Sequence, residues 1–154
     1  MTTAARSAVV TDAFVDAVGH IESSAGRYTV GDGGRANGIW QMHANAWKDV
    51  TQYRARKKLS TWNYSHAHDP VVARVYARDY LTMLESRLRE TLRRSPTAEM
   101  IYAAYNVGFA RLESLDFQIE RTPRITRAAC ARLRPLMAQL ERNSERTLLS
   151  ARAD

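Results

Sequence analysis

Cysteine is almost absent from this chain of 154 residues, which contains only Cys130. A single cysteine excludes an intramolecular disulfide, so the fold cannot depend on an oxidising compartment for its stability. Cys130 lies beside Ala128, Ala129 and Leu133 on the apolar face of a predicted helix. We therefore expect an inert buried thiol, because free cysteine usually packs as a small hydrophobic side chain.

Long apolar runs are also missing. No stretch reaches the roughly 18 apolar residues that a membrane-spanning helix requires, and Met1 to Val10 lack the apolar core of a signal peptide. We expect no transmembrane segment, and the sequence gives no sign of an export route.

Acidic residues are outnumbered, with 16 Asp and Glu against 23 Lys and Arg, which gives a formal net charge of +7. All of the basic residues except Lys48, Lys57 and Lys58 are arginine. Such an excess favours a polyanionic partner, which could be nucleic acid, an acidic membrane surface or the anionic bacterial cell wall. Charge alone does not choose among these three.

The length is that of one domain spanning residues 1–154, with fraying expected at residues 1–10 and 143–154. Hydrophobic residues make up 45% and charged residues 25% of the chain, which is typical of a soluble globular protein. Apolar residues at helical spacing predict helices over about 12–23, 45–53, 70–94, 97–106 and 125–140. The fold class is therefore mainly α.

Capping residues support several of these helices. Thr11 is a candidate N-cap, Asp69-Pro70 supplies an N-cap followed by a proline at the first helical position, and Thr97 opens the next helix. Pro135 is expected to kink the last helix, whose apolar face is predicted to start at Ile125. Between the first two helices, residues 26–38 are rich in glycine and predict a loop or a short β-hairpin.

Glu22 is the first candidate for chemistry. It follows Val18 by four residues, so a helix places its carboxyl at the edge of the buried face. Partial burial disfavours the charged form and raises the pKa of a carboxyl, as a general acid at neutral pH requires. The alternative is an ordinary helix-terminal glutamate paired with an arginine such as Arg27.

Three short motifs place Glu22 in a wider pattern. Ile21 to Gly26 contains a Glu-Ser pair, Gly31 to Met42 contains Gly-Ile-Trp-Gln, and Ala103 to Gly108 reads Ala-Ala-Tyr-Asn-Val-Gly. In order and separation, they resemble the Glu-Ser, Gly-Leu-Met-Gln and Ala-Tyr-Asn-x-Gly motifs of the soluble lytic transglycosylases and goose-type lysozymes. Two departures are Ile39-Trp40 in place of Leu-Met, and His43 after the motif.

The resemblance implies a lysozyme-like helical domain with a saccharide groove in which Glu22 is the catalytic acid. Gln41 and Asn106 would supply amide groups to an N-acetylated sugar, and Tyr105 would face the acid from a distant helix. Ser23 and Met42, which belong to the same motifs, join the predicted substrate-binding residues. Each has an ordinary alternative role: Gln41 could brace a loop, Asn106 could cap a helix, and Tyr105 could belong to the core.

The family resemblance leaves two reactions open for the β-1,4 bond between N-acetylmuramic acid and N-acetylglucosamine. In lytic transglycosylases a single acid suffices, because the sugar's own acetamido oxygen assists and its 6-hydroxyl closes a 1,6-anhydro ring. An inverting hydrolase needs a second carboxylate to activate water. Asp32 lies at a position resembling a goose-type lysozyme's candidate aspartate, although an aspartate between glycines is also a common turn residue. We favour the single-acid reaction, with chitin as an alternative substrate.

Aromatic residues concentrate in the segment expected to line the groove. Among them Trp62 and Tyr64 lie between polar residues, so we expect these two to be exposed and to bind sugar rings. His66, His68 and Asp69 do not have the spacing of a metal site, and we expect neither a metal nor a cofactor.

The rival classes of function have weaker support. Arg54, Arg56, Lys57 and Lys58 form the densest basic run, but no nucleic-acid-binding motif accompanies them. The other alternative, an inactive wall-binding module, is disfavoured because the acid is present. We therefore expect a monomer that binds peptidoglycan glycan strands and not nucleic acid. It would act at the bacterial cell wall, whether periplasmic, secreted or delivered by a phage.

Overall fold

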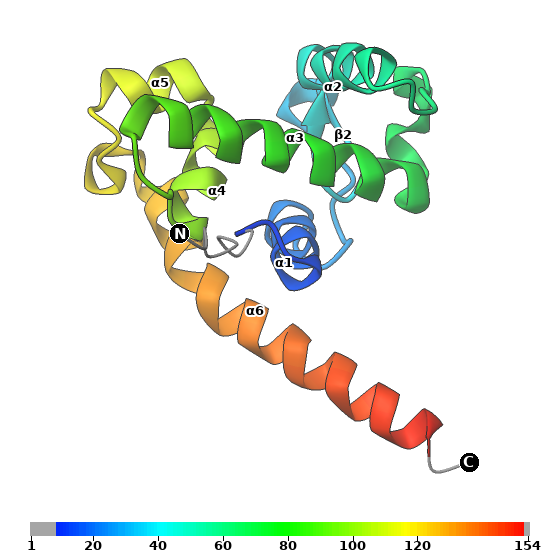
Figure 1. The fold of residues 1–154 in the computed structure, drawn as a ribbon. Coiled ribbons are helices and arrows are strands. Elements are labelled where there is room, and N and C mark those ends of the chain that lie inside the picture. Colours follow the sequence, from blue (N-terminus) through cyan, green and yellow to red (C-terminus); the bar gives the residue numbers. More distant parts are fainter. Residues whose placement is uncertain (1–8, 153–154) are drawn as a thin grey trace, which may run out of the picture.

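A computed structural model describes residues 9–152 of the chain, and Figure 1 shows its mainly helical architecture. The α-helices are α1 (Asp12–Glu22), α2 (Ala44–Arg56), α3 (Pro70–Leu92), α4 (Ala98–Val107), α5 (Phe109–Ser114) and α6 (Arg124–Ala151). The strands are β1 (Val30–Gly31), β2 (Ala36–Asn37) and β3 (Met42–His43), and the 3-10 turns are η1 (Asp32–Gly34), η2 (Tyr64–His68) and η3 (Ile119–Arg121). The predicted fold class is confirmed.

The helices begin where the predicted capping residues lie. Thr11 accepts a hydrogen bond from the backbone N–H of Phe14 at 3.2 Å, and Thr97 accepts one from that of Met100 at the same distance. Asp69 accepts from the N–H groups of two residues in the first turn of α3, and Pro70 occupies the position after the cap. Each cap satisfies backbone donors that a helix leaves unpaired at its start.

Helix α1 supplies the centre of the core. Its Phe14, Val15, Ala17 and Val18 side chains have no exposed area. α3 crosses α1 on one side and α6 runs past it on another (Figure 1). Full burial of one large apolar side chain contributes about 1.5–3 kcal/mol, so α1 is fixed mainly by its apolar face.

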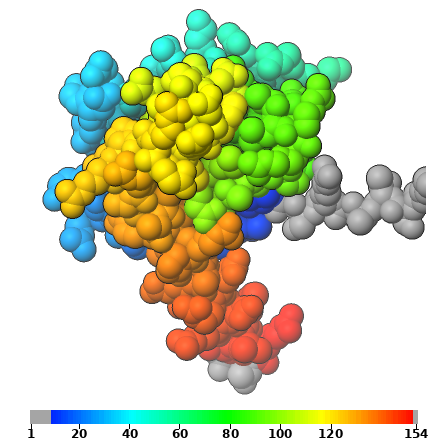
Figure 2. Space-filling model, turned by 90° about the vertical axis from the view of Figure 1, so that its left-hand side faces the viewer, coloured from blue at the N-terminus to red at the C-terminus, as the bar shows by residue number. Residues whose placement is uncertain are grey.

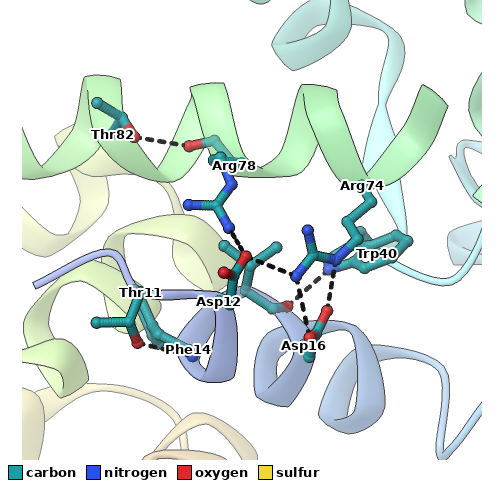
Figure 3. A network of polar contacts seen from close by, with 9 residues as sticks. Thr11, Asp12, Phe14, Asp16, Trp40, Arg74, Arg78 and Thr82 are labelled. Atoms are coloured by element: carbon teal, nitrogen blue, oxygen red, sulfur yellow. Dashed lines mark hydrogen bonds and ion pairs between the residues drawn. The ribbon is translucent and has the colours of Figure 1, made fainter. Parts of the chain in front are cut away.

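A polar network on the outer side of α1 sets its position along α3 (Figure 3). The Arg74 guanidinium donates to Asp16 at 2.7 Å and to Asp12 at 3.0 Å. Arg78 also donates to Asp12. Such partly exposed ion pairs contribute about 0–1 kcal/mol each, so they define the register of the two helices more than they stabilise them.

The glycine-rich segment forms a small antiparallel sheet in the order β1-β2-β3. Val30 pairs with Asn37, and Asn37 pairs with Met42. The prediction of a loop or short hairpin over 26–38 is therefore confirmed as a hairpin, which β3 extends by one strand. Gly38 turns the chain between β2 and β3 with φ +78°, and a Cβ there would lie 1.8 Å from the carbonyl oxygen of Ala67.

Trp40 attaches this sheet to α1. Its indole Nε1 donates to the backbone carbonyl of Val15 at 2.8 Å, and its side chain is only 5% exposed. The indole fits because position 19 of α1 is glycine: a Cβ there would lie 2.7 Å from Trp40 Cε2. A glycine inside a helix costs about 1 kcal/mol relative to alanine, and here it permits the close approach.

Helix α6 is a single helix that includes Pro135 and extends to Ala151. The kink at Pro135 and the fraying from residue 143 stay predictions. Its C-terminal half projects from the body (Figures 1 and 2). Ile125, predicted to be apolar core, is 79% exposed, and the buried face instead starts at Thr126. Of the fraying expected at residues 1–10 and 143–154, the part at residues 1–8 and 153–154 lies outside the described residues. At residues 9 and 10, the backbone N–H groups of Val9 and Val10 donate to the Glu85 carboxylate.

Cys130 is buried, as predicted, and burial raises the pKa of its thiol to about 11. Among residues 9–152, no helix is both long and apolar enough to cross a membrane.

Candidate active site

Glu22 is the last residue of α1, and its half-buried carboxyl meets one face of α4. The Tyr102 hydroxyl donates to Glu22 Oε1 at 2.7 Å, and the Asn106 amide Nδ2 donates to the same oxygen at 3.3 Å. Tyr102 and Asn106 are four residues apart, so the helical repeat places them on the same face of α4. A carboxyl from one helix is thus held by two donors from another.

The pKa of Glu22 is raised above its ordinary value. The main cause is burial, which penalises the charged form. The hydrogen bonds from Tyr102 and Asn106 and the charge of nearby His43 act in the opposite direction without cancelling this effect. The carboxyl can therefore keep a proton at a higher pH than an exposed glutamate, while two donors stand ready to stabilise its anion.

The two oxygens of this carboxyl have different surroundings. Both donors approach Oε1, and within residues 9–152 no protein group is hydrogen-bonded to Oε2. Because Oε1 already accepts two hydrogen bonds, a proton on the carboxyl is best accommodated on Oε2. Oε2 is thus the oxygen through which this group can exchange a proton with a ligand.

The end of α1 is braced by Ser23, which was expected to bind substrate. Ser23 is fully buried. Its hydroxyl donates to the carbonyl of Gly19 at 2.8 Å and accepts from the N–H of Gly26 at 2.8 Å. These contacts terminate the helix directly after Glu22 and hold the following turn. Ser23 is not among the residues that line the cavity described next.

A cavity of about 300 Å³ is lined by Asn106, the residue whose amide donates to the Glu22 carboxyl, while Glu22 itself is not among the lining residues. One wall comes from β3 and the start of α2, and the other from the end of α4, with Tyr80 contributed by α3. The lining residues are Gln41, Met42, His43, Asn45, Ala46, Tyr80, Tyr105, Asn106, Val107 and Gly108. The motifs at Gly38–Met42 and Ala103–Gly108, far apart in sequence, thus meet at one cavity.

Of the residues predicted to bind substrate, Gln41, Met42, Tyr105 and Asn106 line this cavity. The Gln41 side chain donates to the carbonyl of Gly38 at 2.8 Å, and its backbone has a positive φ of 48°. Met42 is 2% exposed. The Tyr105 hydroxyl donates to the carbonyl of Trp40 at 2.6 Å and not to Glu22.

Asp32 lies in η1 and contacts two cationic or potentially cationic side chains. Arg35 Nη2 donates to its Oδ1 at 3.0 Å, and His43 Nε2 lies 3.5 Å from its Oδ2. His43 also lines the cavity, and its charge acts on Glu22. Asp32 is therefore connected to the cavity through His43, and both of its carboxylate oxygens have partners.

Trp62 and Tyr64, predicted to be exposed sugar-binding aromatics, are half-buried and do not line the cavity. The Tyr64 hydroxyl lies 2.7 Å from the carbonyl of Met42 and accepts from the Asn37 amide at 2.9 Å. Trp62 packs edge-on against Tyr76 and lies under the Arg54 guanidinium. The prediction of exposure is wrong for both, because each ring is used in internal packing.

Three residues around the carboxyl and the cavity were not predicted from the sequence. Tyr102 is the clearest, and its signal was available: it precedes Asn106 by four residues, so it shares the helix face of that residue. Tyr80 stacks at a tilt against Tyr105, with ring centroids 5.5 Å apart. Thr126 donates to the Asn106 side-chain oxygen at 2.8 Å, a contact across 20 residues that no local pattern predicts.

Across the part of the chain that the structure describes, no three or more His, Cys, Asp or Glu side chains are placed to hold an ion. The polar side chains that line the cavity are two tyrosines, three amides and the His43 imidazole, and the Glu22 carboxyl is hydrogen-bonded to one of those amides, Asn106.

Comparison with known proteins gives one family. The model described as the transglycosylase SLT domain matches residues 2–121. Neither the curated proteins nor the solved structures give a significant match. The matched segment contains Glu22, the sheet, and α2 to α5, whereas α6 lies beyond it.

Proposed function

The chain belongs to the transglycosylase SLT domain family, and from this premise we propose that Glu22 is the single acid and base of the reaction. Enzymes of this family are lytic transglycosylases that act on peptidoglycan. The bond broken is then the β-1,4 bond between N-acetylmuramic acid and N-acetylglucosamine. The product is a 1,6-anhydro sugar.

The observation that carries this assignment is the unequal environment of the two Glu22 oxygens. Two donors converge on Oε1, and within residues 9–152 Oε2 has no protein hydrogen-bond partner. In the first half of the reaction, Oε2 donates its proton to the glycosidic oxygen while the bond to the anomeric carbon breaks. The raised pKa of Glu22 favours the protonated form that this step requires.

The second half uses the same carboxyl as a base. The 6-hydroxyl of the muramic residue attacks the anomeric carbon, and Glu22 Oε2 takes the hydroxyl proton as the anhydro ring closes. The proton given in the first half is thereby recovered, and no water is consumed. Between the two halves Glu22 is an anion, and the donors from Tyr102 and Asn106 stabilise it.

Substrate binding is assigned to the cavity. Gln41, Met42, Tyr105 and Asn106 line it, and amide groups are suited to hydrogen-bond the acetamido substituent of the sugar. We retain these four as sugar-binding residues. Ser23, Trp62 and Tyr64 are not retained, because none of the three lines this cavity.

Inverting hydrolysis is the second candidate, because Asp32 is linked to the cavity by His43. In that reaction Asp32 would activate a water molecule. The partners on both of its oxygens, Arg35 and His43, weigh against this role, since each must be displaced or shared before the carboxylate can accept a proton from water.

The assignment is tested with purified peptidoglycan and mass spectrometry of the released muropeptides. We expect anhydro-muropeptides from the unaltered protein and their loss by about a thousandfold in Glu22→Gln, a factor of the size seen when a key transition-state group is removed. Glu113→Gln, which alters an exposed glutamate on α5, is the matched control and should retain full activity. Retained activity in Glu22→Gln would contradict the assignment.

A further inference from the structure

We propose that Thr126 of α6 is a positioning residue for the reaction, which it serves by fixing the side-chain amide of Asn106. This inference rests on the proposed role of Glu22. Thr126 carries no cavity-lining surface and does not touch Glu22. It lies beyond residue 121, where the family match ends.

Thr126 contacts Asn106 directly. Thr126 is 1% exposed, and its hydroxyl Oγ1 donates to Asn106 Oδ1 at 2.8 Å. The other end of the same amide, Nδ2, donates to Glu22 Oε1 at 3.3 Å. The three side chains thus form a chain of two hydrogen bonds that runs from a buried hydroxyl to the carboxyl.

The Thr126 hydroxyl fixes the orientation of the Asn106 amide. An asparagine amide can turn over and exchange its oxygen with its nitrogen. Turned over, Asn106 would present Oδ1 to Glu22 and repel the anion by its lone pairs. A hydroxyl donating to Oδ1 opposes that orientation, so it keeps the N–H group directed at the carboxyl. Asn106 itself is exposed, and within residues 9–152 its side chain is hydrogen-bonded only to Glu22 and Thr126.

Contacts of α6 with the rest of the protein hold Thr126 in place. α6 is joined to α4 at a second point, where Arg134 Nη2 donates to Glu99 Oε2 at 2.9 Å. Its first turn is held by Arg127, whose Nη1 donates to the carbonyls of Glu120 and Thr122 at 2.9 Å each. Ala129 and Leu133 are buried on the same face. The hydroxyl is therefore presented to Asn106 from a fixed helix.

Paired variants separate positioning from packing. Thr126→Val removes the hydroxyl and keeps the shape, whereas Thr126→Ser keeps the hydroxyl. We expect Thr126→Val to lower kcat by about tenfold, the kinetic equivalent of one lost hydrogen bond, with little change in KM. Without a fixed Asn106 donor, the basic limb of the kcat/KM profile should move to higher pH. Thr126→Ser should restore both the rate and the profile.

A double-mutant cycle tests whether the effect passes through Asn106. In an Asn106→Ala background, Thr126→Val should cause no further loss, because the amide it positions is gone. Thr122→Val is the matched control: it removes an equally buried hydroxyl whose partner is the carbonyl of Ile119. That control should lower Tm but leave the pH profile in place.

Several results would overturn the inference. They are an unchanged rate and profile in Thr126→Val, a full additional loss in the Asn106→Ala background, or a Thr126→Ser variant as impaired as Thr126→Val. If Thr126→Val does not fold, Thr126→Ala replaces it, since it removes the hydroxyl without adding a methyl group at that point. If Glu22→Gln abolishes activity while Thr126→Val is silent, only the positioning role fails. If Glu22→Gln is fully active, the proposed function fails first.

Discussion

Replacement of Tyr102 by phenylalanine isolates the strongest contact of the Glu22 carboxyl. The variant removes one hydroxyl that donates to Oε1 at 2.7 Å and leaves the ring, which is 1% exposed, in its place. A hydrogen bond to a charged group contributes about 1.5–3 kcal/mol. Since about 1.4 kcal/mol corresponds to a factor of ten in rate, a step that forms or uses the Glu22 anion should slow by roughly ten- to a hundredfold.

The pH dependence of the same variant has a definite sign. The Tyr102 hydrogen bond lowers the pKa of Glu22 against the larger effect of burial, so its loss raises that pKa further. The protonated acid then persists to higher pH, and the basic limb of the kcat/KM profile should move upward. The assay is release of soluble muropeptides across a series of buffers at constant ionic strength.

Tyr76→Phe is the matched control for this experiment. Tyr76 is also fully buried, and its hydroxyl donates to the carbonyl of Trp62 and accepts from that residue's N–H. Its loss should reduce stability by about 1 kcal/mol and leave the profile unchanged. If Tyr102→Phe behaved like this control, with the wild-type rate and profile, the reasoning about Glu22 would be refuted.

Three further predictions follow from the same contacts. Glu22→Gln should raise Tm relative to the unaltered protein at pH 7 and not at pH 4. Because the pKa of Glu22 is raised, the folded state favours the protonated carboxyl, so the stability that Glu22 contributes is present at low pH and lost as pH rises. An equal Tm difference at both pH values would contradict this prediction. Gly19→Ala should destabilise the fold in urea unfolding by up to about 2 kcal/mol, because a clash with Trp40 that costs about 1–3 kcal/mol is only partly offset by the gain of about 1 kcal/mol in helix propensity. A more stable variant would show that the indole moves freely. Asp32→Asn should change the yield of anhydro products by less than about twofold, because the single-carboxyl reaction does not use Asp32, which is paired with Arg35. An inactive variant would indicate that Asp32 is a second catalytic carboxylate.

Local sequence signals predicted the elements that depend on local chemistry. The starts of α1, α3 and α4 follow from Thr11, Asp69 and Thr97, because a cap needs only its own side chain and the next turn. The face of α6 was misplaced because Ile125 is apolar yet exposed, whereas the polar Thr126 is buried. Hydrophobic periodicity cannot detect a threonine that is buried to make a hydrogen bond.

The candidate site was predictable to the same extent. Glu22 and Asn106 stand out from motifs read along the chain, and the structure brings them to one carboxyl. Tyr102 could have been found from the helical repeat. Thr126 could not, since its contact with Asn106 depends on how α6 packs against α4. Trp62 and Tyr64 were misjudged because polar neighbours in sequence do not imply an exposed ring.

The single-carboxyl reaction predicts a different incorporation of oxygen from water than any hydrolytic mechanism does. Digestion of peptidoglycan in water enriched in oxygen-18 should give anhydro-muropeptides that carry no label at the anomeric carbon, because the 6-hydroxyl, and not water, attacks that carbon. Glu22→Gln should release neither product. Labelled reducing ends, formed in step with glycan cleavage by the unaltered protein, would contradict the role assigned to Glu22 as sole acid and base.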